Sequence, residues 1–351
     1  MKKNIFNVFL VLVVLVLNGI PIQSDACTRV VYKGNNGLIL TARSMDWSTE
    51  IGTNLWLLPR GMERNGEVGK NSIHWKSKYG SIIASGFDVA TSDGMNEAGL
   101  VANVLWLAET EYEKWDGTKP GMSIALWAQY VLDQFASVEE AVNNLRKEEF
   151  VVVTAEIPGT SRLTTLHLSI SDASGDNAIF EYVDGKLTIH HSPDYTVMTN
   201  SPIFEKQLAL DEYWKEIGGT TMLPGTNRAA DRYARASFYI NAIPKTEDYR
   251  VAVASVFSVI RNVSVPYGIS TPGKPNISST RWRCVSDHKN KVYYFETALT
   301  PNTFWVDLKQ ADFSEGAAVK KLSIVNNETY SGNALAAFET HELFQFEGIP
   351  E

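Results

Sequence analysis

The 351-residue sequence has few of the residues that bind metals or nucleic acids. It contains two cysteines and six histidines, and the histidines are scattered without the spacing of a zinc site. The formal net charge is −8 and no basic cluster occurs, which argues against a nucleic-acid partner. No Gly-rich phosphate loop is present. We therefore expect no metal and no cofactor, and we interpret the histidines as surface or core residues (His74, His167, His190, His191, His288 and His341).

Long apolar runs are also missing, apart from one near the N-terminus. Residues 8–17 are apolar, follow Lys2 and Lys3, and lead to the small-residue exit Ser24-Asp25-Ala26. That order predicts a secretory signal peptide over residues 1–26, removed after Ala26. The apolar run is too short to cross a bilayer of ~30 Å, and no later segment has ~20 apolar residues. We expect an exported protein, periplasmic or secreted, with no membrane span and one domain over residues 27–351.

Removal of this leader would make Cys27 the first residue. A thiol and a free α-amine would then belong to one residue, and an α-amine with a pKa near ~8 can act as a base near neutral pH. This arrangement is typical of an amide hydrolase. Two alternatives for Cys27 stay open at this point. One is lipoprotein processing, although Ser24 and Asp25 fit its cleavage box poorly, and the second is a disulfide with Cys284.

Strand and helix patterns alternate in blocks along the rest of the chain. Residues 28–32 and 38–42 flank a turn and predict a hairpin, and residues 280–308 predict further strands. Ser137 with Glu140 has the pattern of a capping box, at the start of a helix. Helices are also predicted over 122–135, 202–216, 228–242 and 247–261. Grouped strands and grouped helices indicate an α+β protein, and we expect four layers (αββα), with two antiparallel sheets between helix layers.

Four polar residues stand in otherwise structural surroundings. Arg43 and Asp46 follow an apolar strand, Asn200 lies between a strand and a helix, and Arg232 lies in a helix. Taken singly, each has an ordinary structural role available: a surface ion pair, a helix cap and a solvated helix face.

These residues occur within motifs that resemble the choloylglycine hydrolase family of N-terminal nucleophile hydrolases, which includes bile salt hydrolases and penicillin V acylases. The similarity runs from residue 27 to about 310 and is strongest to the Gram-negative branch, which includes exported forms. The matching motifs follow one another in the family's order: Cys27-Thr28-Arg29, 41–47, Asp93 to Leu100, Met198-Thr199-Asn200, Leu223 to Arg232, Ser278 to Arg281 and Asn290 to Phe295.

The resemblance implies a role for each polar residue. Cys27 would be the nucleophile and its own amine the base, and Arg43 would favour the thiolate. Asp46 would hydrogen-bond the amine, and Asn200 would donate its side-chain amide to the oxyanion. Arg232 would complete the charge network, and water would release the acyl group from the thioester. Met45, Trp47 and Trp106 would line the substrate pocket, and the backbone N–H of Trp106 would also serve the oxyanion.

On this basis we expect a cysteine amidase that cleaves linear amide C–N bonds of a small molecule, with conjugated bile salts as the first choice of substrate. Penicillin V and acyl-homoserine lactones are the alternatives, and a lipid-anchored or disulfide-linked binding protein is the alternative of another class. The resemblance implies a homotetramer, although the segment between Asn200 and Arg232 is shorter than in relatives whose extra hairpin locks tetramers. Cys284 is assigned no role.

Overall fold

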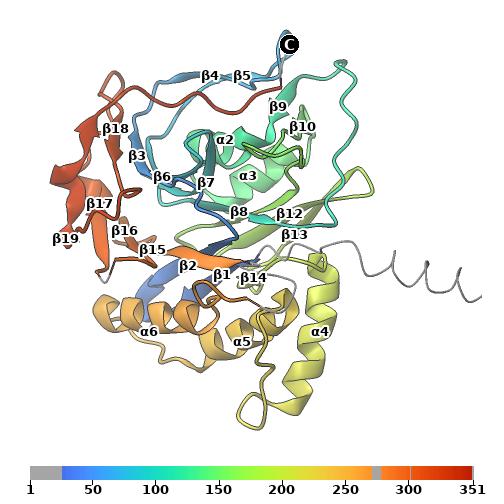
Figure 1. Cartoon of the computed structure of the whole chain (residues 1–351), viewed down its shortest axis with the longest axis vertical. Helices are drawn as coiled ribbons and strands as arrows, with labels where there is room; N and C mark the ends of the chain where they lie inside the picture. Colours follow the sequence, from blue (N-terminus) through green and yellow to red (C-terminus); the bar gives the residue numbers. More distant parts are fainter. Residues whose placement is uncertain (1–25, 271–277, 301, 350–351) are drawn as a thin grey trace, which may run out of the picture.

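Two β-sheets stacked between two layers of helices make up the part of the chain that the computed structural model describes, residues 26–270, 278–300 and 302–349 (Figure 1). The predicted leader lies outside these residues except for Ala26. The four-layer α+β arrangement is the predicted one, and it is confirmed. In the view of Figure 1, α5 and α6 lie below the sheets, and α2 and α3 lie above them.

The first sheet carries the N-terminal hairpin at its centre. β1 and β2 pair antiparallel, with Cys27 opposite Met45 and Ala26 opposite Asp46, as the predicted hairpin requires. β15 pairs on the other side of β2. The seven strands lie in the order β14 (Val197–Met198), β1 (Ala26–Lys33), β2 (Ile39–Trp47), β15 (Ser279–Asp287), β16 (Val292–Thr297), β17 (Phe304–Asp307) and β19 (Gly332–Asn333).

The second sheet is antiparallel throughout and faces the first. Its nine strands lie in the order β13 (Lys186–His191), β12 (Asn177–Val183), β11 (Leu166–Ser171), β8 (Val101–Trp106), β7 (Ala90–Asn96), β6 (Ser81–Gly86), β3 (Leu55–Leu58), β18 (Lys320–Leu322) and β20 (Glu339–Thr340). Two small sheets add β4 (Glu63–Asn65) with β5 (His74–Lys76), and β9 (Gly121–Ser123) with β10 (Val151–Val153).

The helices cover the outer faces of the two sheets. α5 contacts β1 and α6 contacts β2, whereas α2 contacts β7 and β8, α3 contacts β12, and α4 packs on α5. No helix in the described ranges has both the length and the apolar character needed to cross a membrane. The helices are α2 (Trp127–Gln134), α3 (Val138–Leu145), α4 (Phe204–Ile217), α5 (Ala229–Ala242) and α6 (Tyr249–Asn262).

Local signals placed most helix starts correctly. The Ser137 side chain accepts the N–H of Glu140 at 3.2 Å, which confirms the predicted cap of α3, and Glu140 Oε2 accepts the N–H of Ala136 at 2.9 Å instead of that of Ser137. The helix predicted over 122–135 starts later than expected. Gly121–Ser123 pairs with β10 as a parallel strand and a 3-10 turn follows, so the α-helix begins only at Trp127.

The core forms two apolar layers because neighbouring strand residues point to opposite faces of a sheet. Ile82 belongs to the cluster that joins both sheets to α5 and α6, and the adjacent Ile83 belongs to the cluster beneath α2 and α3. Cys27 is a member of the first cluster. The predicted nucleophile therefore lies at the buried junction of the two sheets.

Candidate active site

Cys27 stands at the start of β1 with 2 % of its surface exposed. The chain is continuous at this point, so the Cys27 nitrogen is the peptide nitrogen of the Ala26–Cys27 bond. It donates to Oδ1 of Asn200 at 2.6 Å. Sγ lies 3.9 Å from Sδ of Met45 and 4.0 Å from the Asp46 carbonyl oxygen.

Arg232 of α5 holds the same residue from the other side. One guanidinium nitrogen donates to the Cys27 carbonyl oxygen and to Thr28 Oγ1, both at 2.5 Å, and the other donates to Asn200 Oδ1 at 2.6 Å. The rigid fork of an arginine suits such divergent acceptors. The structure therefore brings Cys27, Asn200 and Arg232 together, although they are far apart in the sequence.

Asn200 connects Cys27 to the second sheet. Its Nδ2 donates to the carbonyl oxygen of Trp106, at the end of β8, at 2.7 Å. The two bonds accepted by Oδ1 fix which end of the carboxamide is the oxygen. A primary amide carries two N–H groups, so one hydrogen of Nδ2 is left for a further acceptor. The predicted oxyanion donor is thus held rigidly, next to Cys27.

Two opposing effects act on the Cys27 thiol. Burial raises its pKa, and the nearby Arg43 guanidinium lowers it through its charge, with burial the stronger of the two. Arg43 is itself buried on β2 and donates to the carbonyl oxygens of Ser92 and of Val104, the latter at 2.7 Å. Arg43 therefore lies beside the sulfur, as predicted, and the thiolate still needs a base to form.

Asp93 is a buried carboxylate that the sequence interpretation did not assign to the site. Its Oδ2 lies 3.6 Å from Arg43 Nη1 and accepts from Asn103 at 2.5 Å. Its Oδ1 accepts from the Tyr293 hydroxyl at 2.6 Å and from the Cys284 thiol at 3.4 Å. The strand that carries Asp93, residues 90–96, is mostly polar or small, so no local pattern in the sequence singled it out. We conclude that Asp93 fixes Arg43.

Asp46 lies close to Cys27 but has other partners in this structure. Its Oδ1 accepts from the Thr280 hydroxyl at 2.5 Å, and its Oδ2 accepts from Ser44 at 3.3 Å. Burial raises its pKa, and the charge of Arg232 acts in the opposite direction. The peptide nitrogen of Cys27 carries one hydrogen, and that hydrogen is already donated to Oδ1 of Asn200. The predicted bond from the amine to Asp46 would need the extra hydrogens of a free α-amine.

An apolar pocket opens beside Cys27 and Arg43. It spans about 790 Å³, counted out to its open mouth, and the exposed surface of its lining is almost entirely apolar. The three predicted pocket residues all line it, and Trp47 and Trp106 meet edge to face at 5.8 Å. Its other walls come from distant segments, including Phe87, Ile124, Ala155, Ile157 and Glu347.

Neither cysteine forms a disulfide. Cys27 and Cys284 are both buried free thiols, and Cys284 lies opposite Arg43 in the β15–β2 pairing. The disulfide-linked binding protein was therefore a wrong alternative for this structure. Within the ranges described, no group of three or more His, Cys, Asp or Glu side chains is placed to hold a metal ion.

Comparisons with known proteins match almost the whole chain. The model of the linear amide C–N hydrolases, choloylglycine hydrolase family, matches residues 27–321. This chain belongs to the choloylglycine hydrolase family. The predicted family is confirmed, and the match begins at Cys27. As a member of this family the protein is a linear amide C–N hydrolase of the N-terminal nucleophile type.

The more similar of the following relatives carry names that refer to penicillin V, and the less similar one carries a name that refers to bile salts. Penicillin V acylase of Pectobacterium atrosepticum is 53 % identical over 350 residues, 93 % of each chain. The solved penicillin V acylase of Agrobacterium tumefaciens is 63 % identical with a TM-score of 0.87, covering 92 % of this chain and all of that one. The bile salt hydrolase/transferase of Clostridium perfringens is 26 % identical over 336 residues, 88 % of this chain and 99 % of the relative.

Proposed function

We propose that this protein is a penicillin V acylase-type enzyme, which cleaves the side-chain amide of a phenoxyacetyl-like substrate. The observation that carries the proposal is the position of Cys27 at an apolar aromatic pocket, in a chain 53–63 % identical to proteins named for penicillin V. Bile salts were the substrate first expected from the sequence. The relatives named for bile salts are only 24–26 % identical, so they support that choice less well.

The chemistry of the pocket supports an aromatic acyl group that carries a hydrogen-bond acceptor. Aromatic rings at the wall suit a phenyl ring packed edge to face. The Nε1–H of Trp106 is buried, and it has no hydrogen-bond partner among the residues that the structure describes. A buried donor without a partner is costly, so an acceptor on the ligand would stabilise the complex. The ether oxygen of a phenoxyacetyl group is such an acceptor.

In the proposed reaction, cleavage after Ala26 first frees the α-amine of Cys27. The amine takes the thiol proton, and Sγ attacks the carbonyl carbon of the substrate amide. Asn200 Nδ2 and the backbone N–H of Trp106 stabilise the oxyanion. Trp106 lies beyond the last residue pair between β7 and β8, which is Asp93 with Asn103. The amine then gives its proton to the leaving nitrogen. Water hydrolyses the thioester and restores Cys27.

Export and assembly are further parts of the proposal. Export through the predicted leader would provide the cleavage that the mechanism needs, and it would place the enzyme in the periplasm or the medium. A homotetramer is proposed from the family resemblance. The exposed apolar side chains of α4 and the loop after it, Leu210, Tyr213 and Met222, offer a surface for such contacts. Light scattering of the purified protein would measure the assembly.

A panel of substrates tests the proposed function. Penicillin V, glycocholate, taurocholate and an N-acyl-homoserine lactone are supplied in parallel, and release of the amine product is measured. We expect kcat/KM to be highest for penicillin V, with no turnover by Cys27→Ala. Faster turnover of either bile salt would favour bile salts, the substrate first expected from the sequence. No turnover of any amide would contradict the catalytic role of the site.

The contribution of Trp106 is tested with an analogue. Replacing the phenoxy oxygen of penicillin V with a methylene group leaves the shape of the acyl chain nearly unchanged. We expect kcat/KM to fall by about tenfold in the native enzyme, the value of one hydrogen bond to a buried donor. Trp106→Phe, which lacks the donor, should treat the two substrates equally. A native enzyme indifferent to the exchange would contradict this contact.

A further inference from the structure

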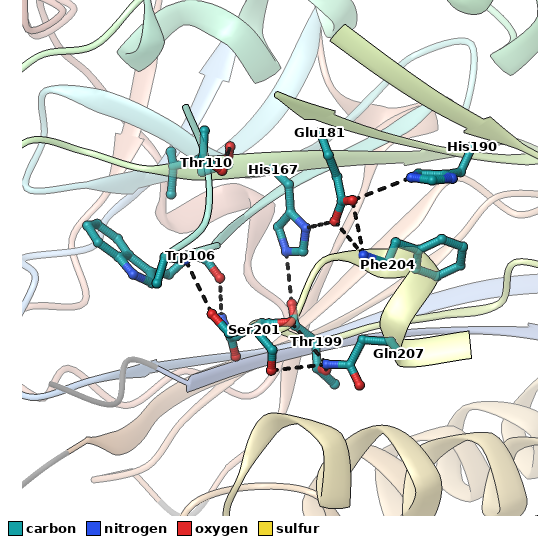
Figure 2. A network of polar contacts seen from close by, with 12 residues as sticks. Trp106, Thr110, His167, Glu181, His190, Thr199, Ser201, Phe204 and Gln207 are labelled. Carbon is teal, nitrogen blue, oxygen red and sulfur yellow. Dashed lines mark hydrogen bonds and ion pairs between the residues drawn. The ribbon is translucent and has the colours of Figure 1, made fainter. Parts of the chain in front are cut away.

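His167 of β11 is a buried histidine that the proposed reaction does not use. It is 2 % exposed and lies at the junction of the two sheets. Its Nδ1 is 3.0 Å from Oε1 of Glu181, and its Nε2 is 2.9 Å from the carbonyl oxygen of Thr199 (Figure 2). Thr199 directly precedes Asn200. The contact therefore ties the second sheet to the segment that carries the predicted oxyanion donor.

Both partners of this imidazole are hydrogen-bond acceptors. A carbonyl oxygen can only accept, and Glu181 behaves as a carboxylate because it also accepts the N–H of Phe204, at 3.1 Å and 3.0 Å. Burial acts to raise the pKa of Glu181, but hydrogen bonds from His167 and His190 outweigh it and lower that pKa to about 2. A ring that donates from both nitrogens carries two protons, which makes it an imidazolium.

His288 provides the contrast within the same protein. Its Nδ1 lies 2.7 Å from the carbonyl oxygen of Gly99, whereas its Nε2 faces the Thr41 hydroxyl at 2.8 Å. A hydroxyl can donate as well as accept, so a neutral ring satisfies both contacts. Burial accordingly lowers the pKa of His288 to about 4. The carboxylate partner is what distinguishes His167.

The segment after Thr199 is held from a second direction. Gln207 of α4 donates its Nε2 to Thr199 Oγ1, to the Asn200 carbonyl oxygen and to the Ser201 carbonyl oxygen, at 3.1–3.2 Å. These bonds hold the backbone from the helix side, and His167 holds it from the sheet side (Figure 2). The Asn200 carboxamide, which contacts the Cys27 nitrogen and Trp106, is thereby fixed at its own backbone.

We propose that His167 is a positioning residue: as an imidazolium paired with Glu181, it clamps the Thr199 carbonyl and so holds Asn200 in the geometry that stabilises the oxyanion. This inference rests on the proposed catalytic role of Asn200. The charged and titratable groups around the contact are Glu181 of β12, His190 of β13, whose Nε2 lies 3.4 Å from Glu181, and Arg232 of α5, which reaches Asn200. A neutral ring has one N–H group, which can donate to only one of the two acceptors, Glu181 and the Thr199 carbonyl.

Kinetics of His167→Gln test the proposal, with His190→Gln as the matched control. His190 contacts the same carboxylate but lies on the far side of it from Thr199. We expect kcat of His167→Gln to fall about 10- to 100-fold, as for a slightly misplaced catalytic group, with KM nearly unchanged. The control should keep native kcat. A folded His167→Gln enzyme with kcat within twofold of native would overturn the proposal.

Glu181→Gln tests the charge and covers the case in which His167→Gln does not fold. Removal of the carboxylate disfavours the imidazolium, so the pH above which kcat declines should move to a lower value. A pH profile identical to that of the native enzyme would overturn the proposal. A purely structural role of the network would lower stability in Glu181→Gln without moving this limb of the profile.

The protonation itself is measured without a substrate. In ¹⁵N-histidine-labelled protein at neutral pH, the ring of His167, assigned by comparison with His167→Gln, should show two N–H signals. The ring of His288 should show one. A single N–H signal from His167 would overturn the proposal even in an active enzyme. Two signals in a protein that hydrolyses no amide would instead place the failure in the proposed function.

Discussion

Asn200 accepts the backbone N–H of Cys27 at 2.6 Å, across 173 residues of sequence. The same oxygen accepts from Arg232, and the amide nitrogen beside it donates to Trp106. One carboxamide thus joins the nucleophile, the cationic helix residue and the pocket wall. The Cys27 nitrogen is the proposed base, and this hydrogen bond already positions it while the Ala26–Cys27 peptide bond is intact.

Asn200→Ala should therefore lose most activity with little change in fold. It removes a proposed oxyanion donor and the acceptor for the Cys27 nitrogen together, and loss of one such donor alone costs about 100- to 1,000-fold in kcat. Asn200→Asp keeps the acceptor and loses the donor, so it should be nearly as impaired. Steady-state kinetics with penicillin V, beside circular dichroism of each variant, measures this. Near-native kcat in Asn200→Asp would contradict the donor role.

Arg232→Lys should also impair catalysis, because a lysine cannot reproduce the fork that reaches Cys27, Thr28 and Asn200 at once. We expect kcat to fall by at least about tenfold, as for loss of orientation. Arg235→Lys is the matched control on the same helix, since Arg235 holds the carbonyl oxygens of Pro224 and Thr226 instead. Equal losses in both variants would point to a general effect on α5.

Asp93→Asn should destabilise the protein and change the thiol. Breaking a buried ion pair typically costs about 3–5 kcal/mol of unfolding free energy. Without the Asp93 carboxylate, the positive charge of Arg43 would be less neutralised, so it should lower the pKa of the Cys27 thiol further. Urea unfolding measures the first effect, and the pH dependence of Cys27 alkylation measures the second. An alkylation midpoint that stays in place would show that Arg43 acts on the sulfur independently of Asp93.

Acid should destabilise the fold through His288. Its pKa is about 4 in the folded protein and near ~6.5 in an unfolded chain, so the unfolded state binds more protons between these values. Stability from this group is complete above about pH 6.5 and is lost as pH falls toward 4, on the order of 3 kcal/mol in all. His288→Gln should flatten the pH dependence of the unfolding free energy over this window. An unchanged slope would contradict the assignment.

Local features of the site were predictable from sequence because they depend on few neighbouring residues. Arg43, Asn200 and Arg232 were assigned to the site through the family resemblance, whereas the hairpin that presents Cys27 and the cap at Ser137 follow from short patterns. The hydrogen bond from Thr280 to Asp46 and the ion pair of Asp93 with Arg43 could not be predicted, because Thr280 and Asp93 reach the site only through strand pairing. The pocket walls were equally hidden, since residues from Phe87 to Glu347 come together only in the folded chain.

The histidines show the same limit. Their scattered positions indicated surface or core residues, and that description fits His288. Only the fold shows that His167 faces two acceptors next to Asn200. A sequence pattern can identify a buried titratable residue, but it does not indicate what lies opposite each ring nitrogen.

The central claim is that Cys27, freed at its N-terminus, carries the acyl group during turnover. Mass spectrometry of enzyme quenched in acid during reaction with penicillin V tests this most directly. We predict an N-terminal peptide that begins at Cys27 and carries a phenoxyacetyl group on its sulfur. A mature chain that begins elsewhere, a blocked terminus, or an acyl group attached to another residue would contradict the account.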